Sequence, residues 1–496
     1  MEISLKWDIT EKRIITTNEE SDLWQKVGEQ LLTLPVPTTL TITTPVGDAK
    51  LNIGKRGTYI KDGVKHPSMY VQPVFNNIRC DASMYEEKYL TCVNPEGNNY
   101  KFYRLLPQNS GGHTVAVDAE YGSIDTDTCA PRRLQTPYES YLFWIRYYEK
   151  LSKGYTDMTK FHAASQEQAK KKVTPGESKD KSANAILYRM LMGFAHHHVQ
   201  ESLQNPASVT QAQVKEARKE FNKMCSMKTR KGFCTHLTKL LALSPRSFGN
   251  RALGNSHLQS MMPRPTHSKE ALQDEFLRII DREENLLLAM EALVGMEDVQ
   301  KTAEKVSDSF KQFGIHVWIA TQEQEKEVKD CLPPSLQSKI KTIYRVKPEK
   351  QEKAFSEYCK RNHIRQIKKL WHGSRNENWA SIIQNSLTIR PTAANGRMFG
   401  DGLYFAPSPN KSWNYTSYRG TTWAHGNADT AFMGLYATAY GDPLMVRTSG
   451  HYTQAQLKSS GHNCVHATAA NTGLRADEII YYDPNAVCLN YLVEFK

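Results

Sequence analysis

The feature that most constrains this chain is a set of three short motifs between residues 370 and 415. They read Leu-Trp-His-Gly-Ser-Arg at 370–375, Arg-Met-Phe-Gly-Asp-Gly-Leu-Tyr-Phe-Ala at 397–406 and Lys-Ser-Trp-Asn-Tyr at 411–415. The glycines at 400 and 402 do not form a dinucleotide fingerprint, because an apolar, strand-like run follows where a helix with a third glycine should begin. The motifs therefore exclude a Rossmann domain, and they place a histidine, a serine and two tyrosines on short strand and turn segments.

A fourth motif, Ala-Asp-Glu-Ile-Ile-Tyr-Tyr-Asp at 476–483, adds an acidic residue, Glu478. Singly, each motif is explained as well by a buried strand or a core histidine. In their joint order they closely resemble the His-Tyr-Glu site of the poly(ADP-ribose) polymerase family. The resemblance implies an enzyme that consumes NAD, releases nicotinamide and transfers ADP-ribose.

The resemblance also implies a role for each matching residue. The catalytic residues would be His372, Tyr404 and Glu478. NAD would be held by His372 and Ser374 at the adenosine ribose, Gly373 and Ser412 at the carboxamide, and Tyr404 and Tyr415 at the nicotinamide ring. Met398 and Lys411 would lie on the acceptor side.

The chemistry of NAD agrees with these residue types. Nicotinamide leaves as a neutral group, so no general acid is needed, and the site must instead stabilise an oxocarbenium-like ribose, which suits the carboxylate of Glu478. Two tyrosine faces attract a cationic ring through their quadrupoles. Gly373, having no side chain, leaves its backbone groups open to the carboxamide.

Composition limits the class of protein. The 496 residues carry a net charge of +12, which permits a polyanionic partner, and 39% of them are hydrophobic without any run of eighteen apolar residues. The first residues lack the pattern of a signal peptide. We therefore expect no membrane contact and an intracellular location: the nucleus in a eukaryote, the cytoplasm in a bacterium. Nine cysteines without a Cys-x-x-Cys pair predict reduced thiols and no metal site.

The N-terminal half divides into two predicted units. Residues 1–80 alternate apolar and polar positions and predict a small β-rich domain to which no role is assigned. Residues 84–163 resemble a WGR domain, a nucleic-acid-sensing module of the same family. At the signature itself, Tyr121 replaces the tryptophan and Ser123 replaces the arginine.

This resemblance makes DNA, or another nucleic acid, an expected partner, and a role in the DNA damage response follows from it. Residues 84–160 contain nine Lys or Arg against ten Asp or Glu, so a contact with phosphate needs a local patch. The candidates are Tyr121, Arg132, Arg133, Lys150 and Lys153. An ordinary β module without such a contact explains the segment almost as well.

Three further segments complete the chain. Residues 164–183 are polar and predict a flexible linker, in which Glu177, Lys181 and Ser182 are candidate automodification sites. Residues 184–297 carry apolar residues at helical spacing. Residues 298–496 form the predicted catalytic domain, with strands at 316–320, 340–346 and 491–495 and a loop over the donor at 387–397. The expected fold is multidomain α+β: N-terminal β-rich units, a helical bundle and a C-terminal ADP-ribosyltransferase fold of split mixed β-sheets.

The predicted function is NAD-dependent ADP-ribosyl transfer to protein acceptors, including the enzyme itself, with NAD as substrate and nucleic acid as regulator. Glu478, Met398 and Lys411 favour polymer formation, whereas Arg397 and Asp401 differ from polymer-forming relatives. Two alternatives stay open. One is a mono-ADP-ribosyltransferase, and the other is an inactive scaffold that binds NAD or ADP-ribose, including a nucleic-acid-binding protein with a vestigial catalytic domain.

Overall fold

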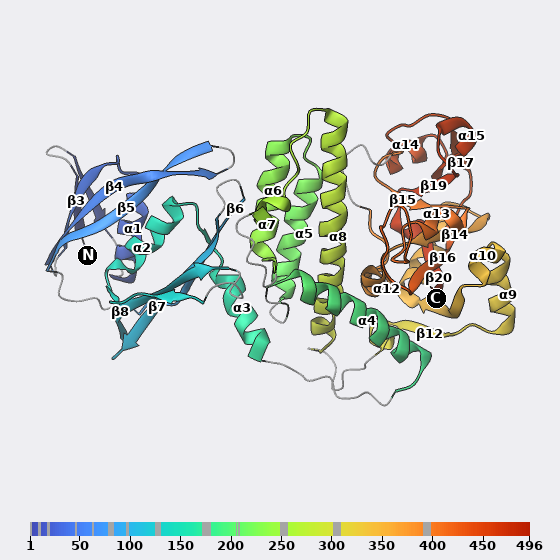
Figure 1. The fold of residues 1–496 in the computed structure, drawn as a ribbon, viewed down its shortest axis with the longest axis horizontal. Coiled ribbons are helices and arrows are strands. Elements are labelled where there is room, and N and C mark those ends of the chain that lie inside the picture. Colours follow the sequence, from blue (N-terminus) through green and yellow to red (C-terminus); the bar gives the residue numbers. More distant parts are fainter. Residues whose placement is uncertain are drawn as a thin grey trace. The chain divides into compact units, whose positions relative to one another are not determined.

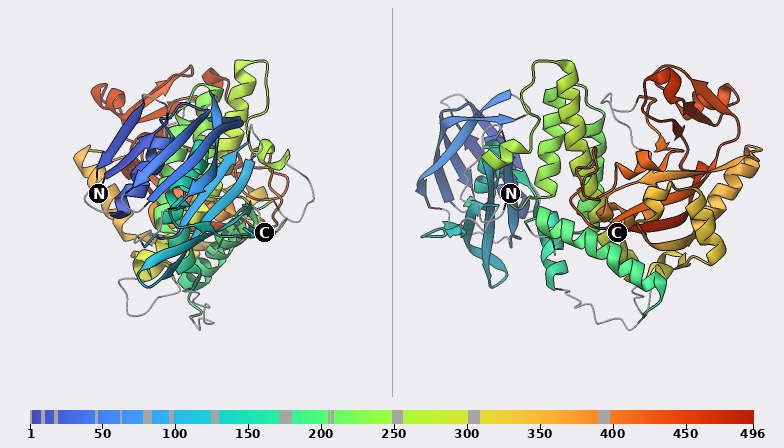
Figure 2. Two further views of the ribbon diagram at one scale, coloured as in Figure 1. Left: turned by 90° about the vertical axis from the view of Figure 1, so that its left-hand side faces the viewer. Right: turned by 45° about the vertical axis from the view of Figure 1, so that its right-hand side comes forward.

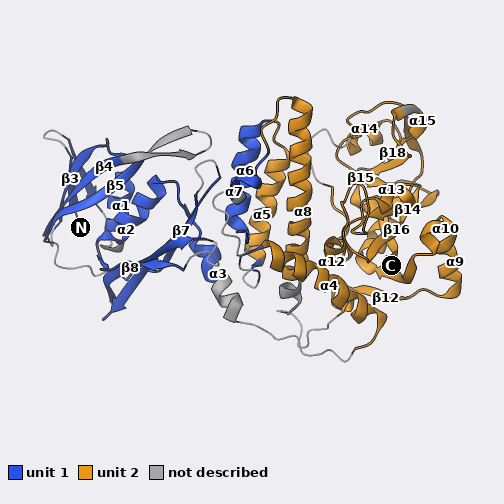
Figure 3. Cartoon of the chain, in the orientation of Figure 1, with its two compact units in different colours: residues 1–171, 203–210, 229–263 blue, residues 172–202, 211–228, 264–496 orange. Residues whose placement is uncertain are grey.

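The computed structural model describes residues 2–7, 11–16, 20–44, 47–61, 64–77, 84–95, 99–124, 130–170, 180–204, 206, 209–248, 256–300, 309–389 and 398–496. The chain forms two compact units (Figure 3). The first comprises residues 1–171, 203–210 and 229–263, and the second comprises residues 172–202, 211–228 and 264–496.

The first unit begins with an antiparallel sheet in the order β2-β1-β3-β4-β5. Its inward positions alternate, as in Leu40 and Ile42, and they pack on Trp24 of helix α1. The elements are β1 (Glu2–Lys6), β2 (Lys12–Thr16), α1 (Glu20–Leu31), β3 (Thr38–Thr44), β4 (Gly47–Lys61) and β5 (Val64–Asn76).

A second sheet follows in the order β10-β8-β7-β6-β11, with β9 paired to β8. Helix α2 packs between the two sheets: Leu142 and Ile145 belong to the core of the first sheet, and Phe143 and Tyr147 belong to that of the second. The segments 1–80 and 84–163 therefore share a helix. The elements are β6 (Lys88–Asn94), β7 (Asn99–Ser110), β8 (His113–Ser123), β9 (Arg132–Arg133), β10 (Tyr138–Glu139), α2 (Leu142–Ser152) and β11 (Thr156–Asp157).

The segment predicted as a linker begins as a helix. Helix α3 (Thr159–Lys170) extends through residues 164–170, and α4 begins at Ala183. The polar composition of residues 164–170 led to the prediction of a linker. The signal for a helix was present, because no glycine or proline interrupts residues 159–170 and alanine, glutamine and lysine favour helix. Of the candidate automodification sites, Glu177 lies outside the described residues.

Apolar helical spacing between 184 and 297 corresponds to several helices. In the second unit, α4 (Ala183–Ser202) and α5 (Gln211–Cys225) pack against the long α8 (Lys269–Gln300), as Figures 1 and 2 show. Helices α6 (Arg230–Leu243) and α7 (Ser256–Ser260) belong to the first unit instead, where α6 contacts β6. The predicted helical bundle is thus divided between the two units.

The C-terminal part of the second unit holds two sheets. One is a five-stranded antiparallel sheet in the order β12-β13-β20-β16-β14, and the other has the order β15-β19-β18-β17, in which β17 and β18 are parallel (Figure 1). The strands predicted at 316–320, 340–346 and 491–495 correspond to β12, β13 and β20. The strands are β12 (Ile315–Ile319), β13 (Ile340–Pro348), β14 (Ile367–Gly373), β15 (Leu403–Phe405), β16 (Ala431–Ala439), β17 (Pro443–Val446), β18 (Cys464–Ala467), β19 (Glu478–Tyr481) and β20 (Val487–Phe495).

Short helices connect these strands. They are η2 (Phe310–Phe313), α9 (Gln322–Asp330), α10 (Pro334–Gln337), α11 (Glu349–Arg361), η3 (Asn376–Asn378), α12 (Trp379–Asn385), α13 (Pro409–Trp413), α14 (Gln454–Ser459), α15 (Ala469–Thr472) and η4 (Pro484–Ala486). The predicted multidomain α+β class with two split C-terminal sheets is confirmed, although only the sheet that contains β17 and β18 is mixed and the other is antiparallel throughout. Across the described ranges, no helix is both long and apolar enough to cross a membrane.

Candidate active site

One pair of backbone hydrogen bonds joins the two C-terminal sheets. Trp371 of β14 and Ala406, just after β15, exchange N–H···O bonds of 3.2 Å in both directions. On its other side β15 pairs with β19, with Phe405 opposite Ile479. The junction therefore brings together three segments that are distant in sequence. It places His372, next to Trp371, beside β15, and Glu478, next to Ile479, on the strand beyond.

His372 is held as a neutral imidazole. Its Nδ1 lies 3.3 Å from the carbonyl oxygen of Tyr404, which can only accept, so Nδ1 carries the proton. The rings of Trp379, Phe405 and Tyr436 surround it, with centroids 5.5–6.3 Å away. Burial among them lowers the pKa of His372 to about 4. Its Nε2 is left as a hydrogen-bond acceptor, which matches a ribose hydroxyl.

Gly373 is required by close packing. A Cβ atom at this position would lie 1.8 Å from the carbonyl oxygen of Ser412, so α13 approaches β14 backbone to backbone. The buried Ser412 hydroxyl donates a 3.0 Å hydrogen bond to the carbonyl oxygen of Trp371. Because its only proton is used there, Ser412 can offer a ligand its oxygen lone pairs, which suits the amide N–H of a carboxamide.

The two predicted ring-binding tyrosines differ in their surroundings. The Tyr404 hydroxyl donates to the Gly400 carbonyl oxygen at 2.8 Å and accepts from the Phe399 N–H at 3.2 Å, which fixes the turn before β15. Tyr415 follows α13 and its side chain is 46% exposed. Burial of its hydroxyl end and the charge of Glu478 raise the pKa of Tyr415. Tyr415 thus offers an accessible ring face in the electrostatic field of Glu478.

The carboxylate of Glu478 lies largely out of solvent and is paired with Lys411. Oε1 of Glu478 is 2.6 Å from Nζ of Lys411, and the two side chains are 14% and 18% exposed. Lys411 also donates to the carbonyl oxygen of Ala476 at 3.1 Å. The structure thus brings the predicted catalytic carboxylate and an acceptor-side residue into direct contact. The other acceptor-side residue, Met398, is exposed, and its carbonyl oxygen accepts from Gly450 N–H at 2.9 Å.

Helix α8 reaches this site through residues that the sequence analysis did not identify. The Nδ2 atom of Asn378 donates both to the Ser374 hydroxyl at 3.0 Å and to Oδ1 of Asn285 on α8 at 2.9 Å. Arg375 donates to the carbonyl oxygen of Ala424 at 2.8 Å and lies 3.7 Å from Asp281, also on α8. The sequence contained one indication of this contact: Asn285 is a polar residue on a helix whose other buried residues are mostly apolar. Of the loop predicted to cover the donor, residues 390–397 lie outside the described ranges.

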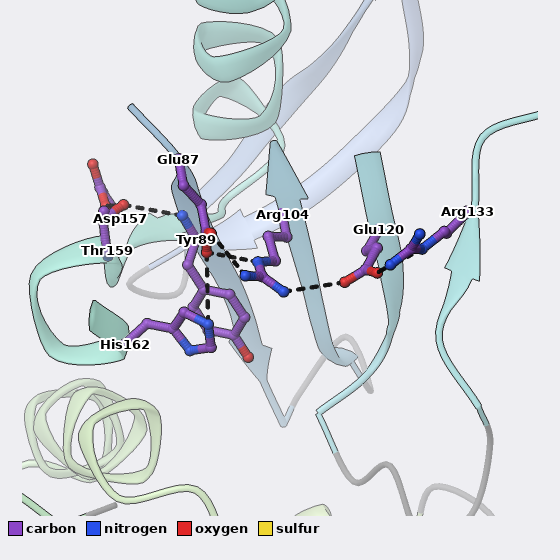
Figure 4. A network of polar contacts seen from close by, with 8 residues as sticks. All are labelled: Glu87, Tyr89, Arg104, Glu120, Arg133, Asp157, Thr159 and His162. Carbon is purple, nitrogen blue, oxygen red and sulfur yellow. Dashed lines mark hydrogen bonds and ion pairs between the residues drawn. The ribbon is translucent and has the colours of Figure 1, made fainter. Parts of the chain in front are cut away.

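The predicted nucleic-acid contacts lie in the first unit and are mostly paired with other side chains. Figure 4 shows Arg104 bound by Glu87 and Glu120, with Arg133 on the far side of Glu120. In the same group Tyr89 stacks on His162 with ring centroids 3.9 Å apart. The Arg133 guanidinium is therefore partly neutralised by Glu120.

The other candidate contacts are dispersed. Nζ of Lys150 lies 3.7 Å from the ring centroid of Tyr103, and burial lowers the pKa of Lys150 to about 8. Lys153 forms a 2.6 Å ion pair with Glu149, and Tyr121 stacks on Tyr103. Arg132 is exposed and has neither an acidic nor an aromatic partner among the described residues. The structure thus leaves Arg132 as the most available of the four cations.

A half-buried imidazole, an accessible tyrosine face and a lysine-paired carboxylate at the junction of two split sheets define an ADP-ribosyltransferase class of site. Comparisons with known proteins agree with this class. The family described as poly(ADP-ribose) polymerase catalytic domain matches residues 320–469, and Glu478 lies just beyond the matched range. The C-terminal part of the chain is thus similar to the catalytic domain of the poly(ADP-ribose) polymerase family.

Several relatives are similar over the same part of the chain. A poly(ADP-ribose) polymerase-like protein, 100L of Invertebrate iridescent virus 6, is 29% identical over 159 residues, which are 30% of this chain and 83% of that protein. Poly(ADP-ribose) polymerase 1 of Gallus gallus is 30% identical over 32% of this chain and 17% of its own length. Poly(ADP-ribose) polymerase 2 of Homo sapiens is 29% identical over 31% of this chain and 30% of its own length. The similarity to the two cellular enzymes thus covers less than a third of either.

Proposed function

We propose that this protein is an NAD-dependent ADP-ribosyltransferase that cleaves NAD to nicotinamide and transfers ADP-ribose to protein acceptors, itself included. The observation that carries the proposal is the Lys411–Glu478 pair beside Tyr415. A catalytic carboxylate has to lie out of bulk water and near the ring that leaves, and the pairing of the largely buried Glu478 with Lys411 beside Tyr415 supports this role. A vestigial site has no need to keep such a carboxylate desolvated.

The residues divide the task between binding and catalysis. Nε2 of His372 accepts a hydrogen bond from a ribose hydroxyl, because Nδ1 already donates to Tyr404. The Tyr415 ring attracts the charged nicotinamide through its face. Ser412 accepts from the carboxamide, and the turn held by Tyr404 limits the space on the other side of the ring. These contacts bind NAD with its glycosidic bond beside Glu478.

Glu478 acts on the transition state. As nicotinamide leaves, positive charge develops on the ribose, and a carboxylate that accepts from the 2′-hydroxyl stabilises that charge. Lys411 holds Oε1 of Glu478 in place and leaves Oε2 for the substrate. We further propose that the product is a polymer, since Glu478, Lys411 and Met398 together match the acceptor side of polymer-forming relatives.

A regulatory contact with nucleic acid is a separate proposal. It is supported by the resemblance of residues 84–163 to a WGR domain and by the exposed cation Arg132 paired in register with Tyr121. Arg132→Gln is expected to weaken binding of broken duplex DNA, with Lys12→Gln, an exposed cation of the first sheet, as control. Equal DNA affinity of the wild type and Arg132→Gln would contradict this contact.

The activity is tested by incubating the purified chain with labelled NAD, with and without broken DNA and with an inhibitor that mimics nicotinamide. Release of nicotinamide with label in the protein supports the proposal, and a ladder of products supports polymer over single transfer. If NAD binds but neither nicotinamide nor labelled protein appears under any condition, the chain is a binding scaffold.

A further inference from the structure

A cavity of about 110 Å³ lies in the second unit, away from the site just described. It is open to solvent on one side and is bordered by the C-terminal end of α11, one face of α14 and the segments flanking β18 and β19. Glu478 is the first residue of β19 and Tyr482 follows the last, so the cavity lies about 13 Å along the strand from the catalytic carboxylate. The lining residues are Tyr358, Arg361, Asn362, Gln454, Leu457, Lys458, His462, Asn463, Tyr482 and Asp483.

Two cations in this lining have no partner. Arg361 ends α11 and Lys458 lies in the last turn of α14, and among the described residues neither forms an ion pair or side-chain hydrogen bond. An unpaired surface lysine or arginine is ordinary. Two from different elements that converge on one cavity raise its potential and favour an anion there.

The one acidic residue of the lining offsets only part of their charge. Oδ2 of Asp483 accepts from Nε2 of Gln454 at 2.6 Å, and Oδ1 accepts from the N–H of Asn485 at 2.9 Å. Asp483 is thus occupied in capping η4 and in fixing α14. Two cations thus face one carboxylate, and the lining keeps an excess of positive charge.

A third nitrogen donor completes the set. The imidazole of His462 lies between α14 and β18, and its Nδ1 is buried, 3.7 Å from Asp442 and without a hydrogen-bond partner. Because Nδ1 makes no hydrogen bond, no partner fixes which ring nitrogen carries the proton, and the ring can donate a hydrogen bond to a ligand in the cavity. An arginine, a lysine and a histidine around one small cavity are the combination by which proteins hold a tetrahedral oxyanion.

We propose that this cavity binds one phosphate group, free or at the end of a nucleotide, separately from the NAD site. The volume has room for several water molecules, and so for one tetrahedral group, but not for a nucleobase. The rings of Tyr358 and Tyr482 are 6% exposed and have no free face on which a base could stack. Recognition therefore ends at the phosphate.

The test is a titration of the full chain with inorganic phosphate and, in a second arm, with ADP. Calorimetry and phosphorus NMR measure the binding in both arms. The variant Arg361→Gln/Lys458→Gln is expected to bind phosphate at least tenfold more weakly. The control Lys360→Gln, which changes an exposed neighbour outside the lining, should stay within twofold of the wild type. A parallel loss of ADP affinity assigns the site to nucleotide phosphates, and a loss for inorganic phosphate alone assigns it to the free ion.

Two results would overturn the proposal. One is unchanged phosphate affinity in the double variant, since binding would then occur elsewhere. The other is a rise in KM for NAD that parallels the loss of phosphate affinity, because the two anions would then share the donor site. Circular dichroism and the Tm of each variant show that the exposed substitutions leave the fold intact.

Discussion

Nζ of Lys411 lies 2.6 Å from Oε1 of Glu478, and both side chains are largely buried. Lys411 belongs to α13, which also carries Ser412, and Glu478 is the first residue of β19. The contact therefore joins this helix to this strand. Pairing with the lysine offsets the cost of removing a carboxylate from water. The same contact leaves one carboxylate oxygen for a substrate hydroxyl.

Replacing this carboxylate tests its role directly. Glu478→Gln keeps the shape and removes the charge, so turnover should fall by about 10²–10³-fold. Binding of NAD should change little, because the interaction strengthens mainly in the transition state. Single-turnover nicotinamide release and equilibrium binding of NAD separate the two. Glu377→Gln, a carboxylate of η3, serves as control, and equal losses of affinity and turnover in Glu478→Gln would refute the assignment.

Gly373 should tolerate no side chain. Gly373→Ala places a Cβ 1.8 Å from a backbone oxygen that cannot move independently of α13, so we expect a loss of about 3 kcal/mol or more in the free energy of unfolding. Gly193→Ala in α4 is the control, since its Cβ meets no atom within 4 Å and should stabilise the helix slightly. Urea unfolding measures both. If Gly373→Ala were as stable as the wild type, α13 would have to lie farther from β14 than the 1.8 Å contact implies.

Asn378 should support NAD binding through Ser374. In Asn378→Ala the serine hydroxyl loses its donor and Asn285 loses its partner, so KM for NAD should rise by roughly tenfold while kcat stays nearly constant. Asn385→Ala is a matched control, because Asn385 makes the same i−4 contact to a serine hydroxyl, Ser381, one helix further on. A fall in kcat without a change in KM would place Asn378 outside substrate binding.

The sequence predicted three strands of the C-terminal sheets, β12, β13 and β20, and it placed the candidate site residues on short strands and turns, because short motifs with fixed glycines specify such elements locally. Gly373 is such a case: its lack of a side chain is visible in the sequence, whereas the reason for it, the approach of Ser412, depends on tertiary packing. The pairing of Lys411 with Glu478 was not predictable for the same reason. Sixty-odd residues separate the two, and charge alone does not choose among many acidic partners.

Elements whose role depends on packing were harder to predict. Helix α2 was read as part of one module, yet alternate faces of it serve the cores of two sheets, as Leu142 and Phe143 show. Lys150 was predicted as a candidate contact with nucleic acid. Its ammonium lies instead over Tyr103, an arrangement that neither periodicity nor net charge reveals.

His372, half-buried among aromatic rings, predicts a pH dependence of stability. Its pKa is about 4 in the folded chain against an ordinary value of 6.5, so between these values the unfolded chain binds the extra proton. Stability should therefore fall as pH decreases from 6.5 toward 4, by about 3 kcal/mol from this group. His372→Gln should lack that component when urea unfolding is compared at pH 7 and 4.5, and the exposed His197→Gln should retain it. An equal pH dependence in wild type and His372→Gln would show that the imidazole is hydrated.

Lys150 predicts a second rise of stability with pH, in the alkaline range. Burial lowers its pKa to about 8 from 10.5, so between these values the unfolded chain binds more protons, and stability should rise with pH through that window. Lys150→Met fills the same space without charge and should remove a rise of about 2 kcal/mol, measured by urea unfolding at pH 8 and 10. Lys153→Met, whose ammonium is paired with Glu149, should keep the rise. Because the Lys150 ammonium already contacts Tyr103, Lys150→Met should also bind DNA as the wild type does, and a marked loss of DNA affinity would mean that the ammonium leaves the ring to reach phosphate.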